Sequence, residues 1–273
     1  MTDGQPELSV VIVAFRSRDL VLSCLRALDE HAGVAYEAIV VDDCSQDGTA
    51  EAVRERFAEA TVLSKQRNEG LVAGRNSALE HVHGRYVLML DADTEVRAGA
   101  LPRLLGELQQ NPKVGLVSPK LTYPDGELQL SCHRFPPFLI PILRRGPLAR
   151  LNPDPRSHRR HMMSDYDHQA TRPVVWTMGA AQMWRSDLVE RIGRYDPRLS
   201  SYGGEDIDWC LRVWAAGLEV LYVPAAEVVH VHRKVTRRRQ FSRQSWRALR
   251  DWYYIQRKHR GLRRDPRLAQ ANK

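Results

Sequence analysis

Residues 86–93 read Tyr86-Val87-Leu88-Met89-Leu90-Asp91-Ala92-Asp93, an apolar run that ends in two carboxylates. The run is typical of a parallel strand that is buried on both faces. Side chains alternate along an extended chain, so Asp91 and Asp93 lie on the same side with the small Ala92 between them. Because open α/β sheets bind ligands at the carboxyl ends of their strands, the pair is a candidate ligand set for a divalent cation. An isolated pair of this kind more often caps a helix and faces solvent, so the hypothesis needs support from the rest of the chain.

The first 120 residues alternate between short apolar runs and amphipathic segments. Strands are predicted at residues 8–15, 38–41, 61–63, 86–90 and 114–118, and helices at residues 18–31, 49–58, 72–81 and 101–110. In the first helix, apolar residues recur at Val21, Cys24, Leu25 and Leu28, which is one helical face. This alternation predicts an α/β fold with a mostly parallel central sheet, right-handed crossovers and flanking helices.

The pattern becomes less regular after Pro119. A turn at residues 123–126 is predicted between short antiparallel strands, whereas residues 135–154 show no clean periodicity. Further elements are predicted as a strand at residues 174–178, a helix at 206–216, a strand at 219–223 that Pro224 closes, and a basic helix at 240–259.

The composition bears on where the protein acts. The chain has no run of about 18 apolar residues, the length that a membrane-spanning helix needs. Its first residues lack the basic-then-apolar order of a signal peptide, so we predict a cytoplasmic location. The four cysteines are scattered without a Cys-x-x-Cys pair, which predicts neither a zinc site nor a disulfide framework.

The net charge of +8 is unevenly distributed. Residues 233–264 hold 13 Lys or Arg and a single acid, Asp251. Removing them from the totals of 41 basic and 33 acidic residues leaves 28 and 32, so the body of the chain is mildly acidic. Such a basic segment suits phosphates, anionic lipid headgroups or nucleic acid.

Three predicted strands end in acidic or polar residues that would meet at one edge of the sheet. The first strand is followed by Arg16, the second ends at Asp42-Asp43, and the fourth ends at Asp91 and Asp93. A carboxylate after the second strand can accept hydrogen bonds from a nucleobase or a ribose. The chain has neither a Gly-x-Gly-x-x-Gly motif after its first strand nor a P-loop, which argues against a Rossmann dinucleotide site and a P-loop NTPase. A metal on Asp93 and nearby Arg side chains would neutralise nucleotide phosphates instead.

A second acidic pair, Glu205-Asp206, follows Gly203-Gly204 at the predicted start of a helix. The glycines would let the backbone approach a ligand closely, and the helix dipole favours anions at this end. Two interpretations stay open at this point. The pair either caps the helix or supplies a general base that takes a proton from an acceptor hydroxyl.

His230 and His232 lie near the end of a predicted strand. Alternation places them on the same side, which favours a metal-ligand role somewhat. A lone histidine in such a position is more often structural or solvent-facing, so this alternative also stays open.

These motifs occur in a characteristic order, at residues 8–15, 40–49, 68–76, 84–93, 177–181, 204–212, 223–230 and 257–259. In that order they resemble the inverting glycosyltransferases of family 2, and within it the rhamnosyltransferase-like branch of bacterial cell-surface polysaccharide synthesis. The resemblance extends from Leu8 to Gly261. No single motif is diagnostic, but the ordered set is highly specific.

The resemblance implies a GT-A (nucleotide-diphospho-sugar transferase) fold and a metal-dependent enzyme. This enzyme would move a sugar, with inversion, from a UDP- or dTDP-linked donor to a hydroxyl of a cell-surface glycan or lipid-linked acceptor. Residues 1–120 would be the nucleotide-sugar-binding half of the domain and residues 121–232 the acceptor-binding and catalytic half. Residues 233–273 would form a basic C-terminal helical segment.

The motif positions also imply roles on the donor side. Ala14 and Arg16 would border the nucleoside. Asp43 would bind the pyrimidine, with Asp42 beside it. Arg75 would approach the diphosphate, and Asp91 would belong to the same donor site.

The remaining implied roles concern the metal and the acceptor. Asp93 would hold Mg²⁺ or Mn²⁺, together with His230. Asp206 would be the catalytic base, with Glu205 as its neighbour or rival. Gly179 and Ala180 would line the acceptor side of the pocket.

Elementary chemistry agrees with these roles. Inversion in one displacement needs a carboxylate opposite the leaving group and no covalent nucleophile, and no nucleophile is evident. The diphosphate gains charge as it leaves, so a metal and Arg side chains would stabilise the transition state. The pKa of the base would be raised only in a dry pocket.

The chain departs from the common pattern of this branch in three places. Asp42-Asp43-Cys44 replaces the frequent Asp-Asn-Ala, which leaves the nucleoside preference open. Asp91-Ala92-Asp93 replaces Asn-Pro-Asp but keeps the carboxylate at the metal position. Gly203-Gly204 replaces aromatic residues, which predicts a roomier acceptor pocket. Residues 135–172 follow no recognised pattern and are a candidate region for acceptor specificity.

Two other functions compete with sugar transfer. A pyrophosphorylase-like nucleotidyltransferase would share the fold, but Arg16-Ser17-Arg18 matches its Gly-rich loop poorly. A nucleic-acid-binding protein would use the basic, aromatic tail but would leave the acidic strand ends without a role, so no nucleic-acid partner is expected. The basic helix itself would either rest on the anionic inner face of a membrane or pack on the domain with a solvated basic face.

Overall fold

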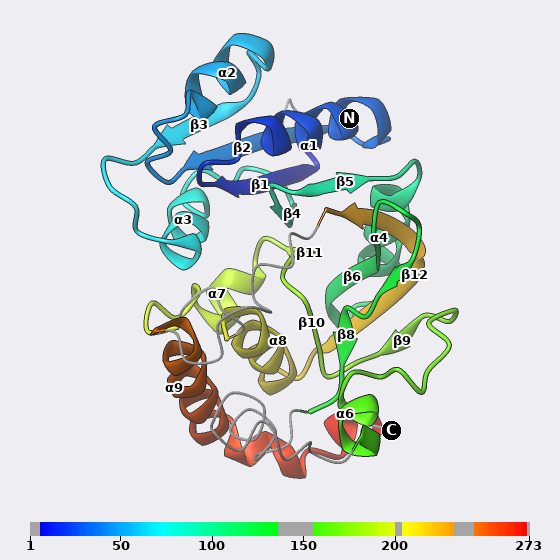
Figure 1. Cartoon of the computed structure of the whole chain (residues 1–273). Coiled ribbons are helices and arrows are strands. Elements are labelled where there is room, and N and C mark those ends of the chain that lie inside the picture. Colours follow the sequence, from blue (N-terminus) through cyan, green and yellow to red (C-terminus); the bar gives the residue numbers. More distant parts are fainter. Residues whose placement is uncertain (1–5, 136–154, 200–203, 232–242, 272–273) are drawn as a thin grey trace.

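One ten-stranded mixed sheet forms the centre of the protein, whose computed structural model describes residues 6–135, 155–199, 204–231 and 243–271. The strand order is β3-β2-β1-β4-β11-β6-β12-β5, with β7 beside β6 and β9 beside β12 (Figure 1). The strands of this sheet are β1 (Leu8–Ala14), β2 (Tyr36–Asp42), β3 (Thr61–Ser64), β4 (Tyr86–Asp91), β5 (Thr94–Val96), β6 (Val114–Thr122), β7 (Leu128–Gln129), β9 (Arg172–Pro173), β11 (Ala181–Arg185) and β12 (Glu219–His230). A small second sheet pairs β8 (Cys132–His133) with β10 (Trp176–Thr177).

The first four strands form the predicted parallel unit. β1 pairs in parallel with both β2 and β4, and β2 pairs in parallel with β3. The carboxyl ends of these strands therefore meet at one edge, as the sequence predicted. The helices are α1 (Arg18–His31), α2 (Thr49–Arg56), α3 (Leu71–Ala78), α4 (Ala100–Gln110), α6 (Pro155–His161), α7 (Leu188–Ile192), α8 (Glu205–Ala215), α9 (Arg243–Lys258) and α10 (Pro266–Ala271), with a 3₁₀ helix η3 (Arg260–Arg264).

The second half of the chain completes the same sheet. β11, which the sequence did not predict, lies antiparallel between β4 and β6. The predicted turn at residues 123–126 joins β6 to β7, which pair in antiparallel fashion. β12 was predicted to stop at Pro224 but continues to His230. Its register with β6 shifts between Val223 and Glu227, so Pro224, which has no N–H to donate, sits where the pairing is interrupted.

Helices cover both faces of the sheet. Alternate residues of β1 separate into two apolar clusters, with Val10 and Ile12 facing α1 and α4 and with Val11 facing α3 and α8. Figure 1 shows α1 and α3 on opposite sides of β1. The arrangement is the α/β sandwich that the alternating sequence pattern predicts.

Some sequence expectations concern chain that the structure does not describe. Residues 136–154, Gly203 and His232 lie outside the described residues, as do residues 240–242 at the start of the predicted basic helix. Across the described ranges, none of the helices combines the length and the apolar character needed to span a bilayer. The four cysteines form no disulfide, and Cys24, Cys132 and Cys210 are buried.

Candidate active site

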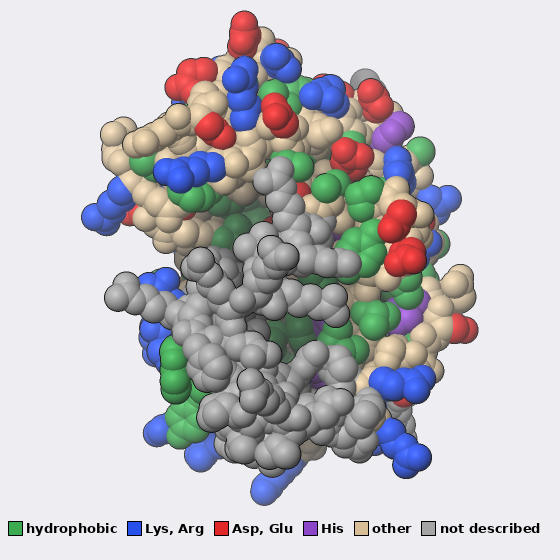
Figure 2. Space-filling model, in the orientation of Figure 1, with side chains coloured by type: hydrophobic (Ala, Val, Ile, Leu, Met, Phe, Trp, Pro, Cys, Tyr) green, Lys and Arg blue, Asp and Glu red, His purple; other side chains and the backbone are tan. Residues whose placement is uncertain are grey.

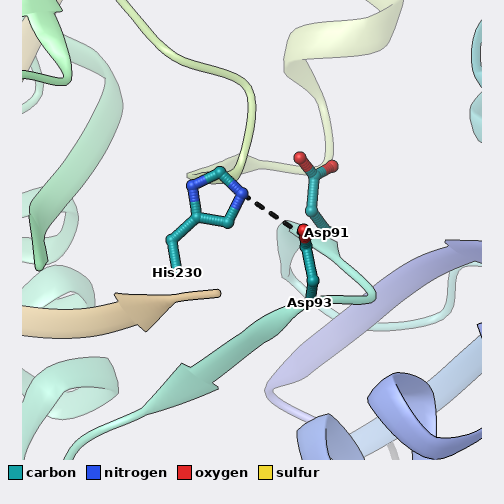
Figure 3. A group of neighbouring side chains, drawn as sticks. All are labelled: Asp91, Asp93 and His230. Atoms are coloured by element: carbon teal, nitrogen blue, oxygen red, sulfur yellow. Dashed lines mark ion pairs between the residues drawn. The ribbon is translucent and has the colours of Figure 1, made fainter. Parts of the chain in front are cut away.

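Two carboxylates and an imidazole gather where β4, β5 and β12 meet. Asp91 ends β4, Asp93 lies in the turn to β5, and His230 ends β12 (Figure 3). The potential ligand atoms of these three residues all lie within 4.8 Å of one another. His230 Nε2 is 3.3 Å from Asp93 Oδ1. Pairing of β12 with β5 places His230 opposite Thr94, which explains how two segments 137 residues apart converge.

A buried glutamine orients this histidine. Gln129 of β7 is 5% exposed, and its Oε1 lies 2.8 Å from His230 Nδ1. A proton on Nδ1 would be donated to Gln129, which leaves Nε2 facing the carboxylates. Burial lowers the pKa of His230, but the ion pair with Asp93 outweighs it and raises that pKa overall. An oxygen-rich set with one imidazole fits Mg²⁺ or Mn²⁺.

Arg75 connects this cluster to the second acidic pair. Its guanidinium is buried, and Nη2 donates to Asp91 Oδ1 at 3.1 Å and to the carbonyl of Gly179 at 2.9 Å. Its Nη1 lies 3.8 Å from Glu205 Oε1 and has no hydrogen-bond partner among the described residues. Although burial acts in the opposite direction, the surrounding acids raise the pKa of Arg75. The cation is thus fixed between carboxylates of two different elements.

Glu205 and Asp206 form the first turn of α8 and are both nearly buried. Asp206 accepts hydrogen bonds from the backbone N–H of Gly179 at 3.2 Å and of Ile207 at 2.8 Å. Burial raises the pKa of Glu205 to about 8, and the charge of Asp206 adds to this effect. Burial also raises the pKa of Asp206. Both carboxylates are therefore shielded from water, the condition under which the pKa of a carboxylate base is raised.

Gly179 and Ala180 lie between the two acidic groups. A side chain at Gly179 would put its Cβ 3.1 Å from Arg75 Nη1 and 3.3 Å from Asp206 Cβ, closer than such contacts usually are. Ala180 accepts a hydrogen bond from the N–H of Asp91 at 2.9 Å. A side chain at position 179 would have to displace Arg75 or Asp206 by a few tenths of an ångström, which favours glycine there.

The carboxylates after β2 fix a neighbouring loop. Asp43 accepts hydrogen bonds from the N–H groups of Glu69 and Gly70, at 2.9 and 2.7 Å. These residues lead directly into α3, so Asp43 helps to position the helix that carries Arg75. Asp42 accepts a hydrogen bond from the N–H of Ser45 at 3.1 Å.

A hollow of about 550 Å³ opens beside these loops and is lined by Asp43 together with Val13, Phe15, Asn68, Glu69, Gly70, Leu71, Val72, Leu199 and Arg247. Ala14 at its border is buried, and its carbonyl accepts the N–H of Asp43 at 2.9 Å. Arg16 is exposed and adopts a positive φ of 50°, as Cys44 does with 65°. Positive φ at such residues is strained and is frequent at ligand sites, which makes the ends of β1 and β2 a candidate binding region.

The structure brings most of the predicted residues together. Asp91, Asp93 and His230 form one group, which Arg75 links to Glu205 and Gly179 links to Asp206. Asp43 lines the hollow at the start of α3, and Ala14, Arg16 and Asp42 each lie next in sequence to a residue that lines it. Gln129 and Arg247 were not predicted, because a polar residue in an irregular segment and one Arg among thirteen basic residues carry no sequence signal of their own.

The C-terminal helix holds the acidic turn in place. Asp208, fully buried in α8, lies 2.7 Å from Lys258 Nζ, 2.7 Å from His259 Nε2 and 2.8 Å from Arg212 Nε. Burial raises the pKa of Asp208, but these partners outweigh it and hold the pKa below its ordinary value. α9 therefore fixes the position of α8 and of the pair at its first turn.

We expect Asp208→Asn to lower the free energy of unfolding by about 3 kcal/mol, because it removes the fully buried charge that Arg212, Lys258 and His259 share. Urea denaturation measures this loss. Glu80→Gln is the control, because it breaks an exposed ion pair with Arg194 and should cost no more than about 0.5 kcal/mol. Since folding lowers the pKa of Asp208, its contribution is complete above the ordinary carboxyl pKa and is lost as the pH falls below it. Equal losses in the two variants would remove Asp208 from this anchoring role.

Comparison with known proteins points to one family. The sequence model described as glycosyl transferase family 2 matches residues 9–165. N-acetylglucosaminyl-diphospho-decaprenol L-rhamnosyltransferase of Mycobacterium tuberculosis is 25% identical over 243 residues, which cover 84% of this chain and 76% of that protein.

Solved structures resemble the chain in fold. The crystal structure of GalNAc-T7 with UDP, GalNAc and Mn²⁺ superposes with a TM-score of 0.68 at 18% identity. The match covers 94% of this chain and 48% of that one, so the chain spans about half the length of this relative. S. aureus TarS 1–349 in complex with UDP-GlcNAc gives a TM-score of 0.63 at 17% identity, covering 92% of this chain and 65% of that one. The predicted GT-A fold is thereby confirmed.

Proposed function

The chain belongs to glycosyltransferase family 2, and from this we propose that it transfers a sugar from a nucleoside diphosphate to a hydroxyl of a glycan or lipid-linked acceptor, with inversion. The proposal rests on one observation. Arg75 links a divalent-metal ligand set to a buried carboxylate pair across the carboxyl edge of the sheet. The family assignment favours this reaction over the nucleotidyl transfer and nucleic-acid binding that the sequence left open.

Asp91, Asp93 and His230 would hold Mg²⁺ or Mn²⁺, with Gln129 orienting the histidine. The bound cation would neutralise charge on the departing diphosphate. The Mn²⁺ in the crystal structure of GalNAc-T7 supports a divalent ion. Arg75 Nη1, buried and without a hydrogen-bond partner among the described residues, is positioned to donate to the same diphosphate.

Asp206 is the better candidate for the catalytic base. Its carboxylate accepts hydrogen bonds from the backbone N–H groups of Gly179 and Ile207, whereas Glu205 is paired with the guanidinium of Arg75. Asp206 would accept the proton of the acceptor hydroxyl as the oxygen attacks the anomeric carbon. Glu205 would keep Arg75 in place and would raise the basicity of its neighbour by like-charge repulsion.

The hollow at the ends of β1 and β2 would take the nucleoside. Each carboxylate oxygen of Asp43 accepts one hydrogen bond from the loop, from Glu69 or from Gly70. Each oxygen therefore has a further lone pair that can accept a hydrogen bond from a nucleobase. Ala14 and Arg16 would border the nucleoside, with Asp42 supporting the turn beside them. Residues 1–120 would supply the donor half and residues 121–232 the acceptor half of one domain, with 233–273 as the basic segment. A cytoplasmic location with contact to the inner face of a membrane is part of the same proposal.

A donor screen tests the function. The protein is incubated with UDP- and dTDP-linked sugars, with Mn²⁺, with Mg²⁺ or with a chelator, and the released nucleoside diphosphate is measured. We expect release with at least one sugar of these two nucleotides and its suppression by the chelator. Absence of release and of binding for every donor would count against the proposal.

The pH dependence of transfer tests the base. Because the base must be ionised and burial raises the pKa of Asp206, the rate should already fall at a pH above the ordinary carboxyl pKa of about 4. Glu205→Gln removes the neighbouring like charge, so its acidic limb should move to lower pH. The measurement is kcat/KM against pH for both proteins. An acidic limb near pH 4 in the unaltered enzyme would contradict the assignment, since an ordinary carboxyl titrates at about that pH.

A further inference from the structure

A second hollow, separate from the metal cluster, lies between residues 197–199 and one face of α9. Its volume is about 540 Å³, and Arg198, Leu199, Arg247, Arg250, Asp251 and Tyr254 form its walls. The α9 residues are spaced at i, i+3, i+4 and i+7, so they share one face of the helix. Leu199 and Arg247 also line the hollow at the ends of β1 and β2, which is called the donor hollow below, so the two hollows adjoin.

The charges in this hollow are arranged for an anion. Arg250 lies 2.8 Å from Asp251, and Arg198 lies 2.9 Å from Asp196, which orients both guanidinium groups. Arg247 is exposed and takes part in no ion pair or hydrogen bond among the described residues. Because Asp251 and Asp196 balance the charges of Arg250 and Arg198, Arg247 supplies the excess positive charge of the hollow, and its planar guanidinium can bind two phosphate oxygens.

The hollow lies directly behind the turn that carries the proposed base. A Cβ on Gly204, the residue before Glu205, would be 3.2 Å from Asp251 and 3.4 Å from Leu199. The start of α8 therefore packs against two residues of the hollow. Asp251 and Leu199 thus connect the hollow with the turn that precedes Asp206.

The neighbouring surface suits a lipid. Trp246 and Tyr253 are 67% and 59% exposed, and they lie seven residues apart on α9, next in sequence to the hollow residues Arg247 and Tyr254. Figure 2 shows hydrophobic side chains beside Lys and Arg at the lower left edge, where α9 lies in Figure 1. Trp and Tyr favour the boundary between water and hydrocarbon. A phosphate site next to such residues fits a lipid-linked phosphate better than a free nucleotide.

We propose that this hollow, built by residues 197–199 and α9, binds the diphosphate of a lipid-linked acceptor and directs its sugar to the active site. The inference rests on the proposed transferase function and assigns the substrate class of its acceptor side. It also gives the basic C-terminal segment a definite task, since Arg247 and Arg250 come from that segment.

Calorimetric titration of the full chain with farnesyl diphosphate tests the proposal, with saturating UDP and Mn²⁺ present to fill the donor hollow. Wild type and Arg257→Glu, an exposed charge reversal on the same helix outside the hollow, should bind it within twofold of each other. Arg247→Glu should bind at least about tenfold more weakly, because it replaces a charge-assisted donor with a repelling carboxylate. Arg250→Gln, which does not line the donor hollow, should bind severalfold more weakly while keeping its affinity for UDP.

Further titrations distinguish diphosphate binding from binding of the lipid chain alone or of bilayer headgroups. Farnesol, which lacks the diphosphate, should not bind. Failure of wild type to bind farnesyl diphosphate, unchanged affinity in both hollow variants, or an equal loss in Arg257→Glu would overturn the proposal. So would displacement of farnesyl diphosphate by phosphatidylglycerol vesicles, because the hollow would then bind bilayer headgroups. A protein that binds no UDP in the presence of Mn²⁺ would instead count against the proposed function itself.

Discussion

Asp206→Asn should lower kcat for sugar transfer by about 10³-fold, because the amide cannot accept the acceptor proton as the new bond forms. Affinity for the nucleotide donor should stay within threefold of wild type, since the amide is isosteric and Asp206 makes no contact with the donor hollow. The amide oxygen can keep one of the two backbone hydrogen bonds, because Gly179 and Ile207 donate to different oxygens of the Asp206 carboxylate. Single-turnover transfer and UDP binding, measured on the same preparation, separate the chemical step from binding.

Glu205→Gln is the matched control, one residue away in the same turn with similar burial. Its ion pair with Arg75 is long, at 3.8 Å, so its loss should affect the rate less than the loss of the base. If Glu205→Gln loses transfer and Asp206→Asn keeps it, the base is Glu205. Unchanged turnover in Asp206→Asn would remove Asp206 from that role.

The regular part of the fold could be read from the sequence because its signals are local. The helix predicted at residues 18–31 has the bounds of α1, since its apolar face repeats at helical spacing over four turns. β4 is an uninterrupted apolar run, and burial on both faces produces that pattern. Both signals depend on residues close together in the chain.

The elements that the sequence missed depend on distant partners. β11, Ala181-Gln182-Met183-Trp184-Arg185, is five residues long and is held by β4 and β6 on its two sides. β12 continues past Pro224 because β6 and β5 supply new partners on the far side of the interruption. Neither pairing produces a residue pattern within the segment itself from which it could be predicted.

The same distinction applies to the site. The strand-end argument brought Asp91, Asp93 and His230 into consideration, because parallel strands share one carboxyl edge. It could not predict that Arg75 is buried between Asp91 and Glu205, since that contact spans 130 residues. The contact of Gln129, in a two-residue strand, with His230 could not be predicted either, because the two residues are distant in sequence.

Asp93→Ala should abolish the metal-dependent stabilisation of the protein by UDP. A ligand at a hundred times its dissociation constant stabilises the folded state by about 2.7 kcal/mol, which corresponds to a rise in Tm of about 5 °C for a chain of this size. Wild type should show this rise with UDP and Mn²⁺ and little of it with UDP and a chelator. The variant should show less than about 1 °C in either condition, because Asp91 and His230 alone leave the cation short of a carboxylate ligand.

Glu95→Ala is the control that distinguishes loss of a metal ligand at Asp93 from the loss of one negative charge nearby. Glu95 lies two residues further on in β5 and is outside the group formed by Asp91, Asp93 and His230. It should therefore keep the full Mn²⁺-dependent rise in Tm. Without metal, Asp93→Ala should unfold near the wild-type temperature, because the lost contact with His230 is offset by relief of repulsion between Asp91 and Asp93. An equal rise in Tm of the two variants with UDP and Mn²⁺ would mean that the overall negative charge at the sheet edge attracts the cation. The coordination role of Asp93 would then be wrong.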